Sequence, residues 1–312
     1  MAVTGTTDFN LEFTELAEEA WERAGREMRS GYDLRTARRS LNLMTIEWAN
    51  RGLNMWTIET GTITLTQGLN TYALPNDTID LLDHVIRTQP NNSSTQSDLS
   101  ITRISVSTYA TIPNKLTQAR PIQVWIQRLS GETNPTSEFL STAIGATDTS
   151  ITLSSTVGLA GAGFIKLDDE IIYYTYIDGN TLGGVFRGQA NTTAASHAVG
   201  ASVFVPQLPA ITVWPTPDNS TTYTFAYWRL RRVQDAGSGP NVQDMNFRFL
   251  PAVAAGLAYH ISMKVPELAQ RVQMLKQAYD EQFDLAAGED REKAAIRFVP
   301  RQQFLGSGGG AY

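Results

Sequence analysis

Acid–base or metal chemistry in this sequence would depend on three histidines, His84, His197 and His260, which lie far apart along the chain. No HExxH, HxH or other histidine–carboxylate spacing connects them, which argues against a zinc site. The absence of cysteine excludes disulfides, thiolate metal ligands and cysteine nucleophiles. We therefore expect structural histidines and a chain that needs no metal or cofactor.

Two groups of carboxylates could also carry chemistry. In "NDTIDLLDH", Asp77, Asp80 and Asp83 would converge on a helix, but β-branched neighbours favour a strand, which turns Asp80 and Asp83 to opposite faces. In "LDDEIIYYTYIDG", the adjacent carboxylates at 168–170 lack the alternation of a calcium loop and predict a hairpin turn. "GNTLGGVFRG" lacks the lysine and hydroxyl residue of a phosphate loop, and no GxSxG pattern occurs. The sequence therefore predicts a protein that is not an enzyme.

The segment "YDLRTARRSLNLMTIEWANRG", residues 32–52, contains three arginines within five positions: Arg35, Arg38 and Arg39. Its periodicity predicts a helix, with Asp33 as the cap and Gly52 as the stop. The arginines lie on the side opposite a core face that consists of Leu34, Ala37, Leu41, Met44 and Trp48.

Leu43 and Ile46 share the arginine side of this helix, so that side begins basic and becomes apolar one turn later. A DNA-reading helix stays polar and basic along its length, and a chain with a net charge of −6 has little attraction for phosphate. Arginine mixed with apolar side chains is typical of protein–protein interfaces. We predict a subunit interface made of Arg35, Arg38, Arg39, Leu43 and Ile46. The alternative is a solvated basic face, with Leu43 and Ile46 covered by a strand.

Helices are predicted at both ends of the chain. The first, at 9–24, repeats apolar residues at three- and four-residue steps, and Gly25 is placed to end it. Two more are expected at 247–264 and 267–287, on either side of Pro266. The core stripes expected for the first and last helices are Phe13, Leu16, Ala17, Ala20, Trp21 and Ala24, and Leu268, Val272, Leu275, Tyr279, Phe283 and Ala286.

Strands are predicted between these helices. "WTIETGTITLTQGLNTYALP" alternates apolar and polar residues around Gly61 and Gly68, which indicates a hairpin followed by a third strand. A short turn or one-turn helix is expected at Tyr109. Further strands are expected at 79–87, 101–106, 121–129, 209–214 and 222–233.

Residues 133–206 differ in composition from the segments around them, because they consist of short strands joined by glycine, threonine and Asp-Gly turns. They predict a small β-barrel or sandwich inserted at a hairpin tip, where insertion costs little. Without them, strands 121–129 and 209–233 could lie side by side. The longest apolar-rich stretch, "FLPAVAAGLAYHISM", is too short to cross a bilayer, so no membrane association is expected.

Two long parts of the sequence resemble the head-to-tail adaptors of short-tailed bacteriophages, also called tail tubular protein A. The first is "YDLRTARRSLNLMTIEWANRGLNMWTIE" followed by "YALPNDTIDLLDHVIR", and the second is "FRFLPAVAAGLAYHISMKVPELAQRVQMLKQAYDEQFDLAAGEDREKAAIRFVPR". The segment "EIIYYTYIDGNTLGGVFRGQANTTAASHAVGASV" is similar instead to small β-modules of phage tail and baseplate proteins.

The resemblance implies a structural virion protein, assembled in the host cytoplasm and placed at the head–tail interface. Known relatives form a ring of twelve copies between the portal protein and the tail nozzle, and genomic DNA passes through the ring without sequence-specific binding. The inserted β-domain could hold tail fibres. By the same resemblance, the candidate portal contacts are Arg297, Phe298, Val299, Pro300, Arg301 and Phe304.

With the resemblance, the sequence predicts an α+β fold. Helices from 1–55 and 243–290 form a bundle, while 56–132 and 207–242 form an antiparallel β-sheet domain. Residues 133–206 form the inserted small all-β domain, and 291–312 form an extended portal-binding tail. The alternative function is another phage tail component, a nozzle or fibre-attachment protein. A carbohydrate-binding tail module is a further alternative, although residues 139–205 contain no tryptophan to stack on a sugar.

Overall fold

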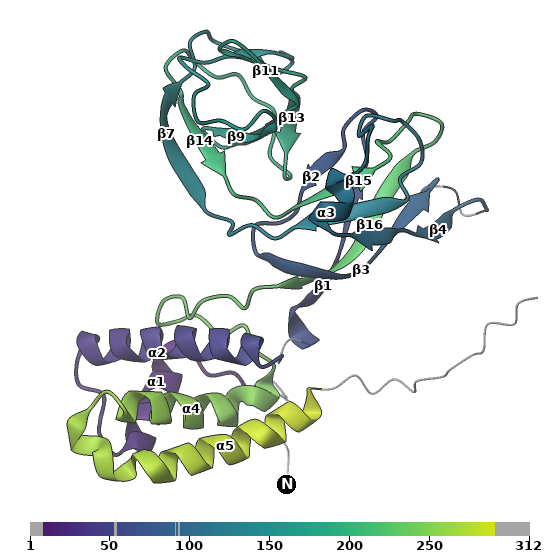
Figure 1. Ribbon diagram of the computed structural model, residues 1–312. Helices are drawn as coiled ribbons and strands as arrows, with labels where there is room; N and C mark the ends of the chain where they lie inside the picture. Colours follow the sequence, from purple (N-terminus) through teal and green to yellow (C-terminus); the bar gives the residue numbers. More distant parts are fainter. Residues whose placement is uncertain (1–8, 53–54, 91, 93, 291–312) are drawn as a thin grey trace, which may run out of the picture. The chain divides into compact units, whose positions relative to one another are not determined.

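The computed structural model describes residues 9–52, 55–90, 92 and 94–290, and the chain divides into two compact units (Figure 1). The first, which we call the helical unit, combines Met1–Met55 with Asp235–Tyr312, and the second, the β unit, is Trp56–Gln234. The described residues form a mixed α+β structure with several antiparallel sheets and five α-helices, as the sequence predicts.

The helical unit is built around its central helix, α4 (Leu250–Ser262). This helix contacts all three of the others: α1 (Phe13–Ala24), α2 (Gly31–Asn50) and α5 (Val272–Glu289). Short 3-10 turns, Phe247–Phe249 and Pro266–Arg271, precede α4 and α5. Segments from the two ends of the chain therefore share one core.

Helix α1 ends at Ala24 as predicted, but it begins at Phe13, four residues after the predicted start at residue 9. All six residues of the predicted stripe are buried. The helix ends at Gly25, whose φ of 97° is left-handed, so its amide can donate to the carbonyl oxygens of Trp21 and Glu22. In α5 the predicted stripe is buried as well, except Val272, which is half-buried.

The N-cap of helix α2 lies three residues before the predicted cap. Ser30 is the N-cap, and its side chain accepts a hydrogen bond from the amide of Asp33. Asp33 lies in the first turn, where its carboxylate accepts from the amide of Arg29 at 3.1 Å. The prediction of Asp33 as the cap was wrong because both residue types cap well, and only the backbone geometry distinguishes them.

Helix α4 is buried on almost every side. Gly256 allows its neighbours to approach closely, because a Cβ atom there would lie 2.5 Å from Met44 Sδ and 2.7 Å from the Tyr279 ring. Beside this contact, Trp48 Nε1 donates a buried hydrogen bond of 2.7 Å to the Tyr279 hydroxyl. The three helices α2, α4 and α5 are thus fixed to one another at a single point of close packing.

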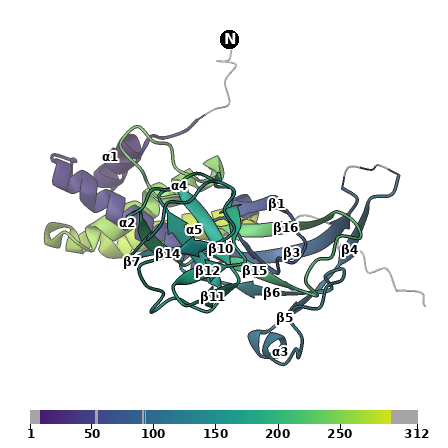
Figure 2. The same ribbon diagram turned by 90° about the horizontal axis from the view of Figure 1, so that it is seen from above.

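Two four-stranded sheets form the base of the β unit, and their neighbouring strands appear side by side in Figure 2. The first has the order β1 (Ile58–Thr64), β16 (Tyr223–Arg231), β3 (Thr78–Thr88) and β4 (Ser97–Ser100), all antiparallel. The second has the order β2 (Thr71–Ala73), β15 (Ala210–Trp214), β6 (Gln123–Gln127) and β5 (Thr102–Ile104), with β5 and β6 parallel. A 3-10 turn at Met55–Thr57 precedes β1, and α3 (Val106–Ala110) is the expected one-turn helix near Tyr109.

The predicted hairpin around Gly61 and Gly68 is wrong. Strand β1 pairs with β16, and β2 pairs with β15 in the other sheet, so the two segments never pair with each other. Gly61 lies inside β1 opposite Tyr227, whose ring occupies the space of the missing side chain. The alternation that suggested a hairpin comes from two separate strands, β1, in which half-buried and exposed residues mix, and β2, whose three residues are all buried.

Residues 133–206 form two further antiparallel sheets. One has the order β13 (Phe186–Gln189), β10 (Glu170–Tyr174), β9 (Gly163–Leu167), β14 (Ser202–Pro206) and β7 (Thr133–Phe139). The other has the order β11 (Tyr176–Asp178), β12 (Thr181–Gly183) and β8 (Ile151–Thr152). The first and last strands of the segment, β7 and β14, pair with each other, and β6 pairs with β15 as expected for the strands on either side.

Two hydrophobic clusters fill the β unit. One consists of residues from 140–203 and centres on Ile165, Ile172 and Val203. The other joins the two four-stranded sheets through Ile86, Val124 and Phe225, and Tyr173 from β10 belongs to it. Residues 133–206 therefore have a core of their own and also contribute to the neighbouring one.

Candidate functional site

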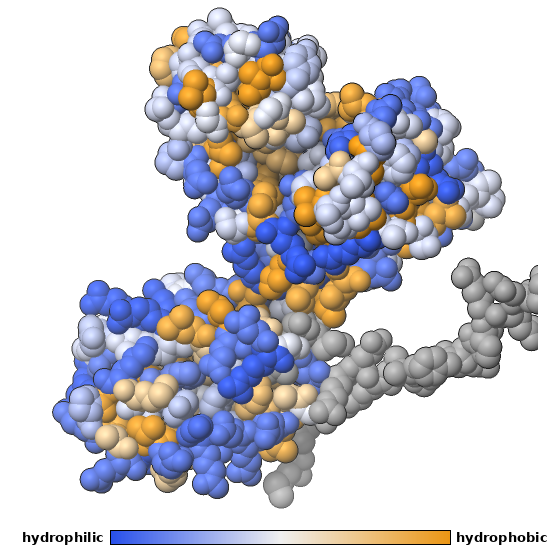
Figure 3. All heavy atoms as spheres, viewed as in Figure 1, coloured by the Kyte–Doolittle hydropathy of each residue, from blue (hydrophilic) through white to orange (hydrophobic). Residues whose placement is uncertain are grey.

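The predicted interface helix presents a continuous exposed stripe. Arg35 and Arg39 are exposed, and Leu43 and Ile46 leave 63% and 58% of their surface accessible. Tyr32, 64% exposed, extends the stripe by one turn. Hydrophobic patches lie among hydrophilic side chains over α2 in Figure 3. Among the residues of the helical unit that the structure describes, no strand covers Leu43 or Ile46, so both apolar side chains are exposed in that unit.

Arg38 does not belong to this stripe. Successive residues of a helix are rotated by about 100° about its axis, so Arg38 points away from Arg39 and toward α1. There its guanidinium lies 5.6 Å from the centre of the Phe13 ring. Its Nε is buried without a hydrogen-bond partner among the described residues. Arg38 therefore packs inside the helical unit, and Arg35 and Arg39 are the arginines that the exposed face carries.

The charge on this face is not neutralised within the described part of the chain. No ion pair of Arg35 or Arg39 occurs among residues 9–52, 55–90, 92 and 94–290. Lys264 lies nearby and donates to Ser40 Oγ at 2.7 Å. Burial lowers the pKa of Lys264, and the positive charge of Arg39 lowers it further. A group of cations without a carboxylate is suited to receive an anionic surface.

The sequence interpretation missed a cluster of charged groups around Glu170. The Glu170 carboxylate is buried and accepts from Arg187 through two parallel bonds of 2.8 Å each. Backbone amides of Gly188 and Ala195 donate to it at 2.9 and 3.0 Å. His197 Nε2 lies 2.8 Å from the same carboxylate. These groups are separated by 17 to 27 residues along the chain, and strand pairing brings them together.

His197 is held between two carboxylates, because its Nδ1 lies 2.7 Å from Asp168 Oδ2. Asp168 is in the two-residue turn between β9 and β10, which confirms the predicted hairpin at 168–170. Burial by itself would raise the pKa of Glu170, but Arg187, the two amides and His197 hold that pKa down at about 2. A carboxylate that accepts this many hydrogen bonds has no free position for a substrate proton, so its geometry is that of a structural ion pair.

The other two histidines lie in separate places. His84 is buried in β3 against the Phe225 ring, and neither of its nitrogens has a hydrogen-bond partner among the described residues. Burial lowers the pKa of His84. Burial also lowers the pKa of His260, which lies in α4. The fold keeps the three histidines apart, which agrees with the expectation from their spacing in the sequence.

The carboxylates near His84 lie in or just before a strand, as predicted, and they serve ion pairs. Asp77 contacts Arg229, a largely buried arginine that also receives Glu59 at 2.7 Å. Asp80 pairs with Arg103 at 2.9 Å. The first two pairs join β1 and β16 to the start of β3, the third joins β3 to β5, and the pairs do not converge on an open site.

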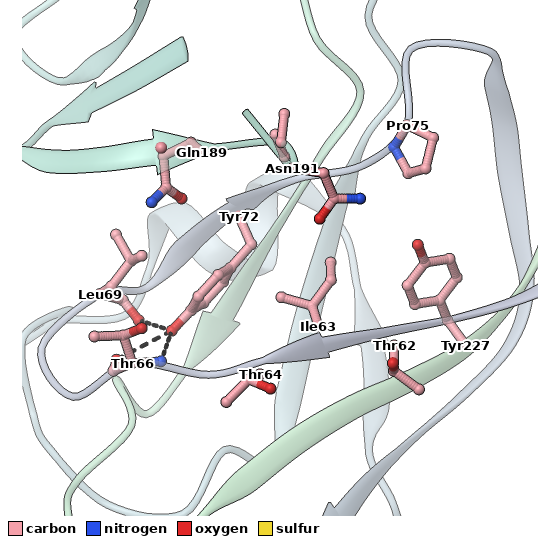
Figure 4. Close-up of a pocket in the computed structure, with 13 residues that line it drawn as sticks. Thr62, Ile63, Thr64, Thr66, Leu69, Tyr72, Pro75, Gln189, Asn191 and Tyr227 are labelled. Atoms are coloured by element: carbon pink, nitrogen blue, oxygen red, sulfur yellow. Dashed lines mark hydrogen bonds between the residues drawn. The ribbon is translucent and has the colours of Figure 1, made fainter. Parts of the chain in front are cut away.

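The β unit contains a cavity of about 440 Å³ between β1, β2 and the turn at 188–191 (Figure 4). Gln189, Asn191 and several threonines line it with amides and hydroxyls. The Tyr72 hydroxyl accepts from the Thr66 amide at 2.8 Å and donates to a backbone carbonyl at 2.7 Å. Burial raises the pKa of Tyr72 and of Tyr227, so both phenols are protonated at neutral pH. The cavity offers neutral hydrogen-bonding groups.

The predicted portal contacts fall beyond the described residues. They are Arg297, Phe298, Val299, Pro300, Arg301 and Phe304. Within residues 9–290, gaps excepted, no group of three or more histidines and carboxylates has the geometry to hold a metal ion. Over the same residues, no helix combines the length and apolar character needed to cross a bilayer.

Comparison with known proteins adds no assignment. No protein-family model matches this chain. No curated protein matches its sequence either. The exposed stripe of α2 is therefore the candidate functional site that its own geometry supports.

Proposed function

We propose that this chain is a structural subunit of a bacteriophage virion: the adaptor ring that joins the portal protein to the tail nozzle. The observation that carries the proposal is the exposed stripe of α2, where Arg35 and Arg39 run into Leu43 and Ile46. Exposed apolar side chains beside unpaired arginines on a small helical unit favour a surface that another protein covers. The resemblance of the helical segments to head-to-tail adaptors identifies that protein as a neighbouring copy.

In this proposal the helices from the two chain ends form a bundle that belongs to the ring wall. The sheets of 56–132 and 207–242 form a domain directed to the nozzle, and 133–206 form an inserted all-β domain on the ring exterior, available to tail fibres. The segment 291–312 contacts the portal. A ring of twelve copies encloses the DNA ejection channel, and the net negative charge of the chain favours passage of DNA over adhesion to it.

The experiment that tests the proposal mixes the purified chain with the portal protein of the same virus and images the product by negative-stain electron microscopy. We expect an additional ring beneath the portal. The matched variant lacks residues 291–312 and should form fewer such complexes, because it has lost the proposed portal contacts. If neither chain adds a ring, the adaptor function is wrong.

A further inference from the structure

A groove of about 540 Å³ lies between α1 and the start of α4 in the helical unit. Phe9 and Phe247 line it and expose 68% and 63% of their surface. The opposite wall is a row of carboxylates on α1, namely Glu15, Glu18, Glu19 and Glu22. Exposed aromatic side chains beside a row of carboxylates form a surface suited to a partner that is both basic and apolar.

Two of these carboxylates are already engaged within the chain. Glu19 pairs with Arg23 at 2.6 Å, and Glu15 accepts from the backbone amide of Glu12 at 3.2 Å. Glu18 and Glu22 are exposed, and neither forms an ion pair with any residue that the structure describes. The groove therefore carries two uncompensated negative charges, one helical turn apart.

The exposed stripe of α2 has the complementary charges at the same spacing. Arg35 and Arg39 are also four residues apart, which is about 6 Å along a helix. Toward the C-terminal end of α2 the stripe continues with Leu43 and Ile46. Read from N to C, the face is basic first and apolar afterwards.

The groove has the matching order when α1 is read in the opposite direction. From the C-terminal end of α1, Glu22 and Glu18 come first, and the apolar Leu11 and Phe9 follow. An antiparallel pairing of α2 with α1 would therefore place charge against charge over the helix and, just before α1 begins at Phe13, apolar Ile46 against apolar Leu11.

We infer that the α1–α4 groove of one copy receives the α2 stripe of the next copy, with Arg35 facing Glu22 and Arg39 facing Glu18. In the same register Ile46 lies on Leu11, and Leu43 lies opposite Thr14. The inference rests on the proposed ring and specifies its subunit contact.

The two surfaces share no residue, so each copy offers its groove to one neighbour and its α2 stripe to the other. A contact of this kind between different surfaces is heterologous, and it closes into a ring when the rotation between copies permits. An isologous dimer would instead need the groove and the stripe of one copy to engage the same partner at once, and it would give linked pairs in place of a ladder in the cross-linking test below.

A cysteine pair provides the first test, because the chain contains no cysteine of its own. One preparation carries Ile46→Cys and another Leu11→Cys, and they are mixed during ring assembly under mild oxidation. The mixture should give a disulfide-linked pair that neither preparation gives alone, since a disulfide needs Cα atoms within about 7 Å. The double variant should give a ladder of linked subunits. Leu285→Cys, on the exposed side of α5, replaces Ile46→Cys as the control and should not cross-link.

Charge reversal provides the second test. Arg35→Glu with Arg39→Glu, and separately Glu18→Arg with Glu22→Arg, should each weaken ring formation roughly tenfold or more, because like charges then face each other. A mixture of the two variants should recover ring formation, because the reversed stripe of one meets the reversed groove of the other, and the unchanged stripe meets the unchanged groove. One chain carrying all four changes should recover as well.

The matched control is Glu281→Arg with Asp284→Arg on the exposed side of α5, which changes the net charge as much as the groove variant does. Its ring formation should be unchanged. Circular dichroism of each variant establishes that the monomer is folded.

The outcomes separate this inference from the proposed function. If rings form but show neither the cross-link nor any sensitivity to charge reversal, the inferred contact is wrong and the proposed ring still stands. If deletion of 291–312 prevents association between copies while reversal at Arg35 and Arg39 does not, the basic C-terminal segment occupies the groove and the inference is wrong. A chain that forms no ring, concentrated or with portal, overturns the proposed function as well.

Discussion

At the scale of single residues, the Glu170 cluster shows how a buried charge is accommodated. The carboxylate replaces its lost hydration with Arg187, two backbone amides and His197. These partners come from β13 and from the segment between β13 and β14, so the cluster ties both to the β9–β10 hairpin. Removal of one partner would leave others buried without a counter-charge.

Glu170→Gln should therefore destabilise the β unit by roughly 3–5 kcal/mol, because Arg187 loses its counter-charge in a buried position and His197 loses a hydrogen-bond partner. The measurement is thermal or urea unfolding followed by circular dichroism at pH 7. Asp169→Asn is the matched control, since the Asp169 side chain is fully exposed at the tip of the same hairpin, and it should change stability little.

The same carboxylate predicts a pH dependence. Its pKa is lowered from 4.5 to about 2 in the folded chain, so the folded state binds fewer protons than the unfolded state between these values. The stability from Glu170 is present in full above pH 4.5 and is lost as the pH falls toward 2. The stability difference between wild type and Glu170→Gln should shrink over this range; a constant difference would show that the pKa is not shifted.

At the scale of secondary-structure elements, α4 is the helix on which the other three depend. Its small residues permit close approach, and Gly256 is the extreme case, since any side chain there would overlap Met44 and Tyr279. In isolation glycine weakens a helix by about 1 kcal/mol relative to alanine. Its place in α4 is therefore explained by packing and not by helix propensity.

Gly256→Ala should destabilise the helical unit by roughly 1–2 kcal/mol, because overpacking of a tight contact outweighs the gain in helix propensity. Gly288→Ala is the matched control. Gly288 lies in α5 with open space around it, so alanine there should have no effect or stabilise by up to about 1 kcal/mol. Thermal unfolding of both variants measures the difference, and equal shifts would contradict the packing argument.

At the scale of the whole molecule, the two compact units differ in how the chain builds them. The β unit is one continuous segment, and both of its hydrophobic clusters lie inside 56–234. The helical unit needs both ends of the chain, because α1 and α2 bury their apolar stripes largely against α4. A fragment that contains either end alone leaves such a stripe exposed.

A fragment of residues 56–234 should fold by itself and unfold cooperatively. Fragments 1–55 and 235–312 should be poorly helical alone and should gain helix when mixed, because each supplies the surface that the other lacks. Circular dichroism of the separate and mixed fragments tests this. If the helical content of the mixture equals the sum of the two separate fragments, the two ends do not depend on each other.

Much of the fold could be predicted from local pattern. The stripe of α1, the exposed Leu43 and Ile46 and the segregation of short strands into 133–206 follow from periodicity and composition, which depend on near neighbours. The hairpin at Gly61 could not be predicted correctly, because pairing with β16 joins residues about 170 positions apart and leaves no local signal. Arg38 was assigned to the wrong side because its contact with Phe13 belongs to another helix.

The sequence by itself determined which parts of this protein are helix and strand, and it placed arginines and apolar residues on one exposed face of α2. Tertiary structure alone decided that Glu170, Arg187 and His197 meet, and that an acidic groove on α1 carries its charges at the spacing of Arg35 and Arg39. The physical reason is the distance along the chain over which each effect acts. Backbone propensity and periodicity act within a few residues, whereas ion pairs and surface complementarity depend on where distant segments pack.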